Sequence, residues 1–303
     1  MAEFGETPNL FGTLDDTKQQ YGRMMGKLMS MYEFPAPDET VKTETISVGE
    51  ISVRTYAPDG ATGNEPVGVY FHGGGFVMGS VEQEDGLCRL LSRHGRMTIV
   101  SVEYRLAPEF PFPTAVSDSV SATKWALARY GCDSVILLGS SAGANLAFAA
   151  ALSLIDDGLP EKVKGVVSLA PITVHPDAVP HDKRGQYTAY DENDKFTVNS
   201  KAAMLAWLDA YNAPAADPYL SVLLHPKLKQ LQKVYIAGFG ADTLRDDAQL
   251  MKEALEESGV PIMYDTYPGY PHYSGIFPSK CLDGHRKEFF GGVFKGIGWM
   301  TQK

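Results

Sequence analysis

The sequence predicts an α/β protein in which helices cover both faces of a mostly parallel β-sheet. Short apolar runs of strand length recur along the chain, and stretches of helical character separate them. The runs are apolar throughout, as is typical of parallel strands that are buried on both faces. We expect strands near 66–71, 97–102, 134–138, 163–169, 233–237 and 262–267, with helices near 83–93, 114–130, 142–156 and 246–258.

Two further elements precede this alternation. Residues 45–58 alternate apolar and polar side chains around a Gly-Glu pair, which predicts an antiparallel hairpin. Closer to the N-terminus, Tyr21, Met25, Leu28 and Tyr32 recur at spacings of three and four. That spacing predicts a helix with one buried face.

One segment interrupts the alternation. Residues 171–200 carry three prolines, two histidines and many charges, and residues 201–212 then read as a helix. A structureless insertion of this length is unusual inside a compact domain. We predict a single domain over 1–303 whose cap is formed by about 1–40 and about 175–213; an ordinary long surface loop is the alternative.

Composition excludes several classes of protein. The 303 residues are 44% hydrophobic and 21% charged, as in an ordinary globular chain. The 27 basic against 37 acidic residues give a net charge of −10, without the basic patch of a nucleic-acid binder. No apolar run is long enough to cross a membrane. The three cysteines form no zinc or disulfide pattern, and the first residues resemble no secretory leader, so we expect a cytoplasmic protein.

The strongest chemical signal is the pentapeptide that runs from Gly139 to Gly143, Gly-Ser-Ser-Ala-Gly. It follows an apolar strand and opens an apolar helix, which is the setting of a nucleophile elbow. A sharp strand-to-helix turn holds its central residue in a strained backbone, and the flanking glycines remove side chains that would collide. We therefore predict that Ser141 is presented to substrate as a nucleophile.

A second signal is the run His72-Gly73-Gly74-Gly75 at the end of an earlier strand. Consecutive glycines let the backbone approach a ligand and turn its N–H groups toward it, which suits an oxyanion hole. A phosphate-binding loop would need a following Gly-Lys-Ser/Thr sequence, which is absent.

A nucleophilic serine needs a base and an acid that orients the base. His272 follows a late strand in a loop rich in Gly and Pro, whereas the other histidines after Ser141 lie in less suitable places. Asp242 follows the preceding strand, and Asp246 is the fallback acid. The rejected histidines are His175 and His181 in the predicted cap, His225 in a predicted surface turn, and His285 at the start of a charged helix.

Together these motifs resemble the hormone-sensitive-lipase family of α/β-hydrolases, the carboxylesterases marked by HGGG and GDSAGG. Asp242 begins the sequence DTLRDD, and His272 follows 30 positions later, at the family's spacing. The segment 104–109, Tyr-Arg-Leu-Ala-Pro-Glu, also resembles a family hallmark. The resemblance covers roughly 45–300 and implies the α/β-hydrolase fold: a mostly parallel, eight-stranded sheet flanked by helices, with a helical cap.

Carried over by position, the resemblance implies Ser141 as nucleophile, Asp242 as acid and His272 as base. It implies that the N–H groups of Gly74, Gly75 and Ala142 form the oxyanion hole, with His72, Gly73, Gly139 and Gly143 supporting the motifs. The chain departs from the family pattern at three positions: Ser140 replaces the usual Asp, Ala144 the usual Gly, and Tyr273 the common Gly.

We therefore expect a serine carboxylesterase that hydrolyses a small-molecule ester through an acyl-serine intermediate, without metal or organic cofactor. Acyl groups of roughly two to eight carbons should fit a pocket closed by the cap. The alternatives are an amide or formamide hydrolase, an acyl hydrolase of secondary metabolism, and a non-catalytic small-molecule receptor. The expected apolar lining of the cap is Met25, Met29, Tyr187, Phe196, Leu205 and Trp207.

Overall fold

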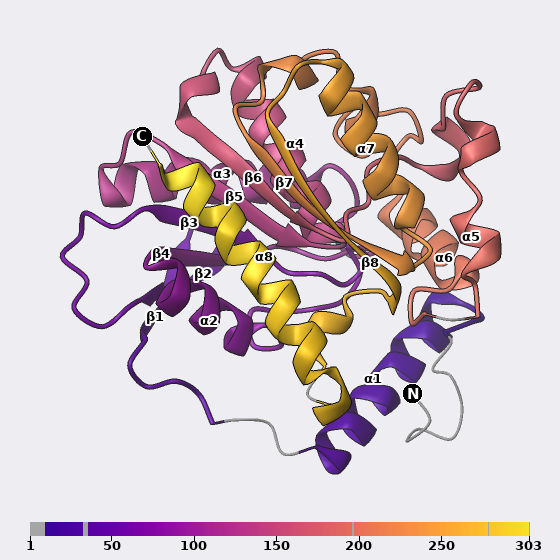
Figure 1. Cartoon of the computed structure of the whole chain (residues 1–303), viewed down its shortest axis with the longest axis horizontal. Coiled ribbons are helices and arrows are strands. Elements are labelled where there is room, and N and C mark those ends of the chain that lie inside the picture. Colours follow the sequence, from indigo (N-terminus) through magenta and orange to yellow (C-terminus); the bar gives the residue numbers. More distant parts are fainter. Residues whose placement is uncertain (1–9, 33–35, 196, 278, 303) are drawn as a thin grey trace.

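In the part of the chain that the structure describes, eight strands form one sheet at the centre of the protein (Figure 1). The computed structural model describes residues 10–32, 36–195, 197–277 and 279–302. The strand order is β1-β2-β4-β3-β5-β6-β7-β8, and only the β1–β2 and β2–β4 pairs are antiparallel. The predicted mostly parallel, eight-stranded sheet is confirmed. The strands are β1 Lys42–Val48, β2 Ile51–Ala57, β3 Val67–Phe71, β4 Thr98–Glu103, β5 Val135–Ser140, β6 Val163–Leu169, β7 Val234–Ala241 and β8 Ile262–Pro271.

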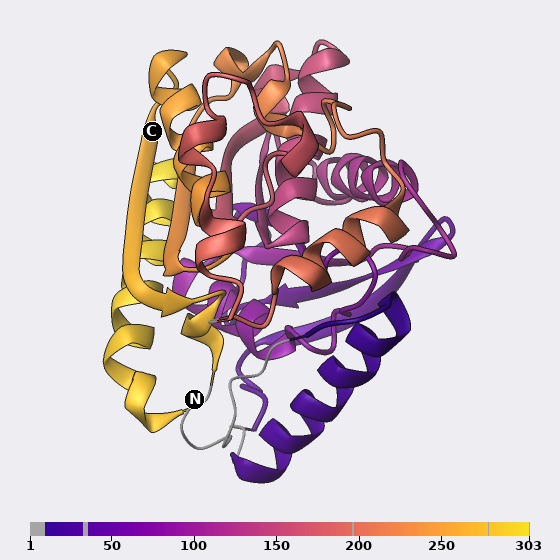
Figure 2. The same cartoon turned by 90° about the vertical axis from the view of Figure 1, so that its right-hand side faces the viewer.

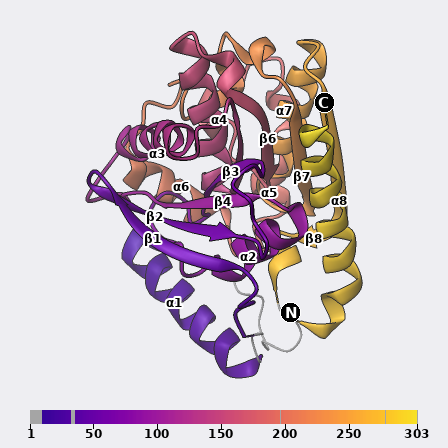
Figure 3. The same cartoon turned by 90° about the vertical axis from the view of Figure 1, so that its left-hand side faces the viewer.

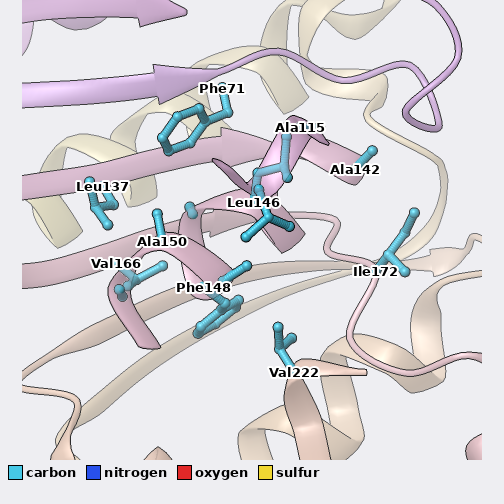
Figure 4. Close-up of a cluster of buried hydrophobic side chains, with 14 of the residues drawn as sticks. Phe71, Ala115, Leu137, Ala142, Leu146, Phe148, Ala150, Val166, Ile172 and Val222 are labelled. Atoms are coloured by element: carbon cyan, nitrogen blue, oxygen red, sulfur yellow. The ribbon is translucent and has the colours of Figure 1, made fainter. Parts of the chain in front are cut away.

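Helices cover both faces of the sheet, as the apolar strands require. Along β3, Tyr70 packs into one buried cluster, whereas Val69 and Phe71 pack into the other. This alternation follows from the two-residue period of a strand. Figure 1 shows α8 crossing the near face, and Figure 4 shows Phe71, Leu137 and Val166 grouped with side chains of α4. One layer holds α2 Asp85–Gly95 and α8 Asp283–Thr301; the other holds α3 Thr114–Tyr130, α4 Ala142–Asp156 and α7 Arg245–Glu257.

The N-terminal helix α1, Leu14–Met31, lies outside these two layers, below β1 and β2 in Figure 3. Its start is fixed by a capping box, in which the side chain of Thr13 and the side chain of Asp16 each accept a backbone N–H of the other. It packs against α6, Lys201–Tyr211. There the indole N–H of Trp207 donates to Thr17 Oγ1 at 3.1 Å.

The expected cap lining is only partly right. Leu28 of α1 is buried as predicted, and Trp207 of α6 is buried as well. Met29 and Leu205 are 68% and 40% exposed, so their prediction as apolar lining is wrong. Both point to solvent because the helix faces toward the body are taken by other side chains, including Met24. Phe196 lies outside the described residues.

The insertion between β6 and α6 folds into short turns and one short helix, α5, Ala189–Glu192 (Figure 2). The first turn of α7 holds it in place. Asp246 Oδ2 accepts the backbone N–H groups of Thr188 at 2.6 Å and Ala189 at 2.7 Å. Asp247 Oδ2 accepts the hydroxyl of Tyr187 at 2.7 Å. Two buried acidic side chains therefore hold the insertion against the sheet domain.

Asp247 predicts a measurable dependence of stability on pH. Burial raises its pKa from 3.8 to about 7. The folded protein then keeps this proton up to about pH 7, whereas the unfolded chain releases it near pH 4, so stability should fall as the pH rises between these values. The full shift in pKa is worth up to ~4 kcal/mol. Urea unfolding at pH 5 and pH 8 would measure it.

The matched variant is Asp247→Asn, whose carbonyl can still accept the N–H groups of Thr173 and Val174. It should be less sensitive to pH than the wild type over this interval. Asp133→Asn, at an exposed position, should behave like the wild type. An Asp247→Asn protein with the wild-type dependence of unfolding free energy on pH would contradict the argument.

Candidate active site

The nucleophile elbow forms where β5 meets α4. Ser141 lies between them with φ 54° and ψ −118°, a strained conformation for a residue with a side chain. A Cβ at Gly143 would lie 2.0 Å from the carbonyl oxygen of Phe71, and one at Gly139 would lie 2.2 Å from the carbonyl oxygen of Gly143. The turn is thus closed to larger residues at both glycines, as the pentapeptide predicted.

The glycine-rich loop after β3 lies beside this elbow because β3 and β5 are neighbours, with Phe71 opposite Gly139. His72 shapes the loop from below: its Nδ1–H donates to the carbonyl of Gly73 at 2.8 Å, and its ring stacks on Tyr104 at 4.2 Å between centroids. Burial lowers the pKa of His72 to about 4. The imidazole is therefore neutral at physiological pH and supports the loop without carrying a charge.

Three N–H groups in this region have no acceptor among the residues that the structure describes. Gly74 has φ 124°, and a Cβ there would lie 2.1 Å from the carbonyl oxygen of Met78, so the loop turns back sharply. Within the described part of the chain, no acceptor takes the N–H of Gly74, Gly75 or Ala142. Ala142 also opens helix α4, whose first N–H groups have no acceptor within the helix. Such donors suit a developing negative charge.

The predicted acid, Asp242, and the predicted base, His272, lie side by side at the ends of β7 and β8. These strands are paired with Ala241 opposite Pro271, so the residues that follow them lie side by side. His272 Nδ1 and Asp242 Oδ2 are 2.6 Å apart, with the imidazole N–H donating to the carboxylate. Asp246, the fallback acid, points elsewhere and pairs with Arg245 at 2.7 Å. Of the two candidates, the structure brings only Asp242 to His272.

Ser141 and His272 both lie in largely buried positions, with 6% and 8% of their surface exposed. Their neighbours in sequence are linked through Tyr70, whose hydroxyl is 3.2 Å from Ser140 Oγ and 3.2 Å from the hydroxyl of Tyr273. Among the described residues there is no direct hydrogen bond between Ser141 Oγ and His272 Nε2. A base often closes on its nucleophile only when substrate is bound.

The arrangement can be compared with known proteins. Residues 68–274 match the family described as having the alpha/beta hydrolase fold. The chain belongs to the hormone-sensitive-lipase-like family of α/β-hydrolases.

Two curated relatives of this α/β-hydrolase are versiconal hemiacetal acetate esterases. The one from Aspergillus parasiticus is 55% identical over 300 residues, which cover 99% of this chain and 96% of the relative. The one from Emericella nidulans is 49% identical over 286 residues, covering 94% of this chain and all of the relative. A solved structure, the hyperthermophilic esterase of the archaeon Pyrobaculum calidifontis, is 30% identical with a TM-score of 0.80, over 95% of this chain and 93% of its own. This α/β-hydrolase is an esterase.

Sequence reasoning missed two residues of the insertion that reach the acid and the base. Asn199 Nδ2 donates to Asp242 Oδ1 at 2.9 Å, and the backbone N–H of Leu244 donates to the same oxygen at 3.0 Å. Thr197 accepts the backbone N–H of His272 at 3.3 Å and donates to the side chain of Asn199. No motif marks these contacts, because they join segments about 43 and 75 residues apart.

The remaining histidines have other surroundings. His225 was predicted in a surface turn, which is wrong for its side chain: it is buried and bonds Asp156 at 3.1 Å. His285 is also buried, stacks on Tyr270 and bonds Ser274 Oγ at 2.9 Å. In the described ranges, no three His, Cys, Asp or Glu side chains gather as a metal site. None of the described helices is both long and apolar enough to span a membrane.

Proposed function

We propose that this esterase hydrolyses carboxylic esters through an acyl-enzyme formed on Ser141. The observation that carries the proposal is the 2.6 Å hydrogen bond between His272 and Asp242, beside an elbow whose serine has φ 54°. His272 takes the proton from Ser141 as its Oγ attacks the ester carbonyl, and returns it to the leaving alcohol. A water molecule, activated by the same imidazole, then attacks the acyl carbon and releases the acid and the free serine.

The negative charge of each tetrahedral intermediate falls on the former carbonyl oxygen. In this proposal the N–H groups of Gly74, Gly75 and Ala142 receive it, since each is free of a protein acceptor within the described residues. The loop and the start of α4 hold these N–H groups in place before the reaction begins. Little reorganisation therefore accompanies the reaction.

The relatives favour one of the alternatives, an acyl hydrolase of secondary metabolism. Both versiconal hemiacetal acetate esterases are named for an acetate ester, a short acyl group on a larger alcohol. In this chain, the indole of Trp207 packs against Gly75, where an added Cβ would lie 2.5 Å from the ring. A buried, bulky wall beside the oxyanion loop supports a small acyl subsite. We propose an acetyl or similarly short ester of a bulky alcohol as substrate, with α1 and the segment 175–213 as its cap.

This proposal predicts a steep dependence on acyl length. With p-nitrophenyl esters, kcat/KM should be highest from two to about four carbons and should fall beyond about eight, because each further methylene meets a packed wall instead of apolar space. A series from acetate to palmitate measures it, with Ser141→Ala as the background control. Rates that rise up to sixteen carbons would contradict the small acyl subsite.

The same acetyl group on an amide separates the ester from the amide alternative. p-Nitroacetanilide should turn over at least about 10²-fold more slowly than p-nitrophenyl acetate, because an anilide is a poorer leaving group. Comparable rates would instead favour an amide hydrolase. A protein that binds these compounds without any turnover would favour the receptor alternative.

A further inference from the structure

Glu84 precedes helix α2. Its carboxylate points into the protein and contacts both the oxyanion loop and the nucleophile elbow. The side chain keeps partial exposure, but protein atoms surround the carboxylate, and this burial raises its pKa. Position 84 is the N-cap of α2, yet the side chain makes no capping bond to the helix. Among the described residues, the hydrogen bonds of its side chain go to Tyr70, Gly73 and Ser140 around the site.

Two of these bonds join the oxyanion loop to the nucleophile elbow. The backbone N–H of Gly73 donates to Glu84 Oε1 at 3.1 Å. Ser140 Oγ, next to Ser141, donates to the same carboxylate at 3.1 and 3.3 Å from its two oxygens. Gly73 lies in the loop after β3 and Ser140 ends β5, so the carboxylate ties two separate segments to each other.

A third bond extends the network to the loop of the base. The hydroxyl of Tyr70 donates to Glu84 Oε2, and the hydroxyl of Tyr273 lies 3.2 Å from that of Tyr70. Because Tyr70 has one proton and gives it to the carboxylate, Tyr273 must be the donor in the second contact. Tyr273 therefore donates to Tyr70, and Tyr70 donates to Glu84.

The network needs an acceptor with two free oxygens. The carboxylate accepts hydrogen bonds from one N–H and two O–H groups, and none of these contacts requires Glu84 to donate. An amide at this position would present an NH₂ group to at least one of these donors. The negative charge also lies close enough to His272 for the two groups to interact electrostatically.

We propose that Glu84 is a positioning residue for acyl transfer: its carboxylate ties the oxyanion loop at Gly73 to the elbow at Ser140 and, through Tyr70, to Tyr273 beside His272. This inference rests on the proposed function at Ser141. The carboxylate keeps the free N–H groups of the loop at a fixed separation from the nucleophile.

The test is Glu84→Gln assayed with p-nitrophenyl acetate. We expect kcat to fall 10- to 100-fold while KM stays within about threefold, because the change affects the alignment of reacting groups and not the pocket. Labelling of Ser141 by an organophosphonate should slow by a similar factor. The matched control is Glu82→Gln, two residues away on the same segment, whose exposed side chain pairs with Arg54. It should retain wild-type kcat.

A relocation variant separates positioning from general stability. In Ser140→Asp/Glu84→Ala a carboxylate is placed near the two donors that remain, the hydroxyl of Tyr70 and the N–H of Gly73, since Ser140 Oγ lies 3.2 Å from that hydroxyl and 3.1 Å from Glu84 Oε1. Its kcat should be at least about fivefold higher than that of Glu84→Ala. Tyr273→Phe, which removes only the last hydroxyl, should lower kcat by a smaller factor and remains informative where Glu84→Gln does not fold.

The outcomes are distinct. If Glu84→Gln and Tyr273→Phe both fold and keep kcat within twofold of the wild type, the inference is wrong, while Ser141-dependent turnover in the wild type still supports the proposed function. The inference is equally wrong if Glu84→Ala loses kcat and the relocation variant recovers none of it. If wild-type turnover does not depend on Ser141, the proposed function fails, and this inference fails with it.

Discussion

Replacing Ser141 with alanine is expected to abolish ester turnover while leaving the fold intact. The substitution removes only Oγ, for which the described residues provide no hydrogen-bond partner, so it should cost little stability. Without the nucleophile no acyl-enzyme forms, and kcat should fall by at least about 10³-fold. Initial rates with p-nitrophenyl acetate, together with circular dichroism and thermal unfolding, measure both statements.

A serine-directed organophosphonate provides the control for this prediction. It should label Ser141, and peptide mass spectrometry should find no label on Ser140, whose hydroxyl is engaged with Glu84. Ser140→Ala should therefore still be labelled. Labelling of Ser140 that persists in the Ser141→Ala protein would overturn the assignment of the nucleophile.

The second large effect concerns the acid. Asp242→Asn should lower kcat on the order of 10⁴-fold, if it behaves like the best-studied serine triad. Asn199 and the N–H of Leu244 both donate to one oxygen of the native carboxylate, so they should hold the new amide with its carbonyl toward them. Its NH₂ group then faces His272 Nδ1 and forces the proton onto Nε2, the nitrogen that must accept it from serine. Rates across a pH series would measure the loss.

Asp246→Asn is the control, because Asp246 lies only four residues further on, in the first turn of α7, but bonds Arg245 and the backbone N–H of Thr188. It should change kcat by less than about tenfold, with its main cost in the stability of the insertion. If the two variants exchanged effects, Asp242 would not be the acid.

The parts of the fold that depend on local pattern were predictable from the sequence. Apolar strand runs and the glycines around Ser141 are read over a few neighbouring residues, and the structure contains them where expected. Pairings between distant segments were not predictable. Glu84 meets Ser140 across 56 positions, and Asn199 meets Asp242 across 43, with no periodicity or motif to connect either pair.

Burial in the predicted cap was the weakest part of the prediction for a related reason. The periodicity of a helix identifies a stripe of apolar residues, but methionines on α1 extend around more than one face. Which methionine is covered depends on the neighbouring helix: Met24 is buried, while Met29 remains in solvent. The helical pattern alone does not decide between them, because burial on α1 also depends on the neighbouring segments, among them α6, which it contacts.

Asn199 contacts the acid and Thr197 contacts the base. The insertion therefore cannot be replaced as a whole without losing these contacts. A designer who replaces this segment with that of a related enzyme, in order to change which alcohols are accepted, also removes the amide that orients Asp242. In the proposed cap, the residues that would select the alcohol and the residues that hold Asp242 and His272 therefore lie in one stretch of chain. Substitutions that broaden the substrate range can be made at other positions of the insertion, but the residues at positions 197 and 199 must be kept.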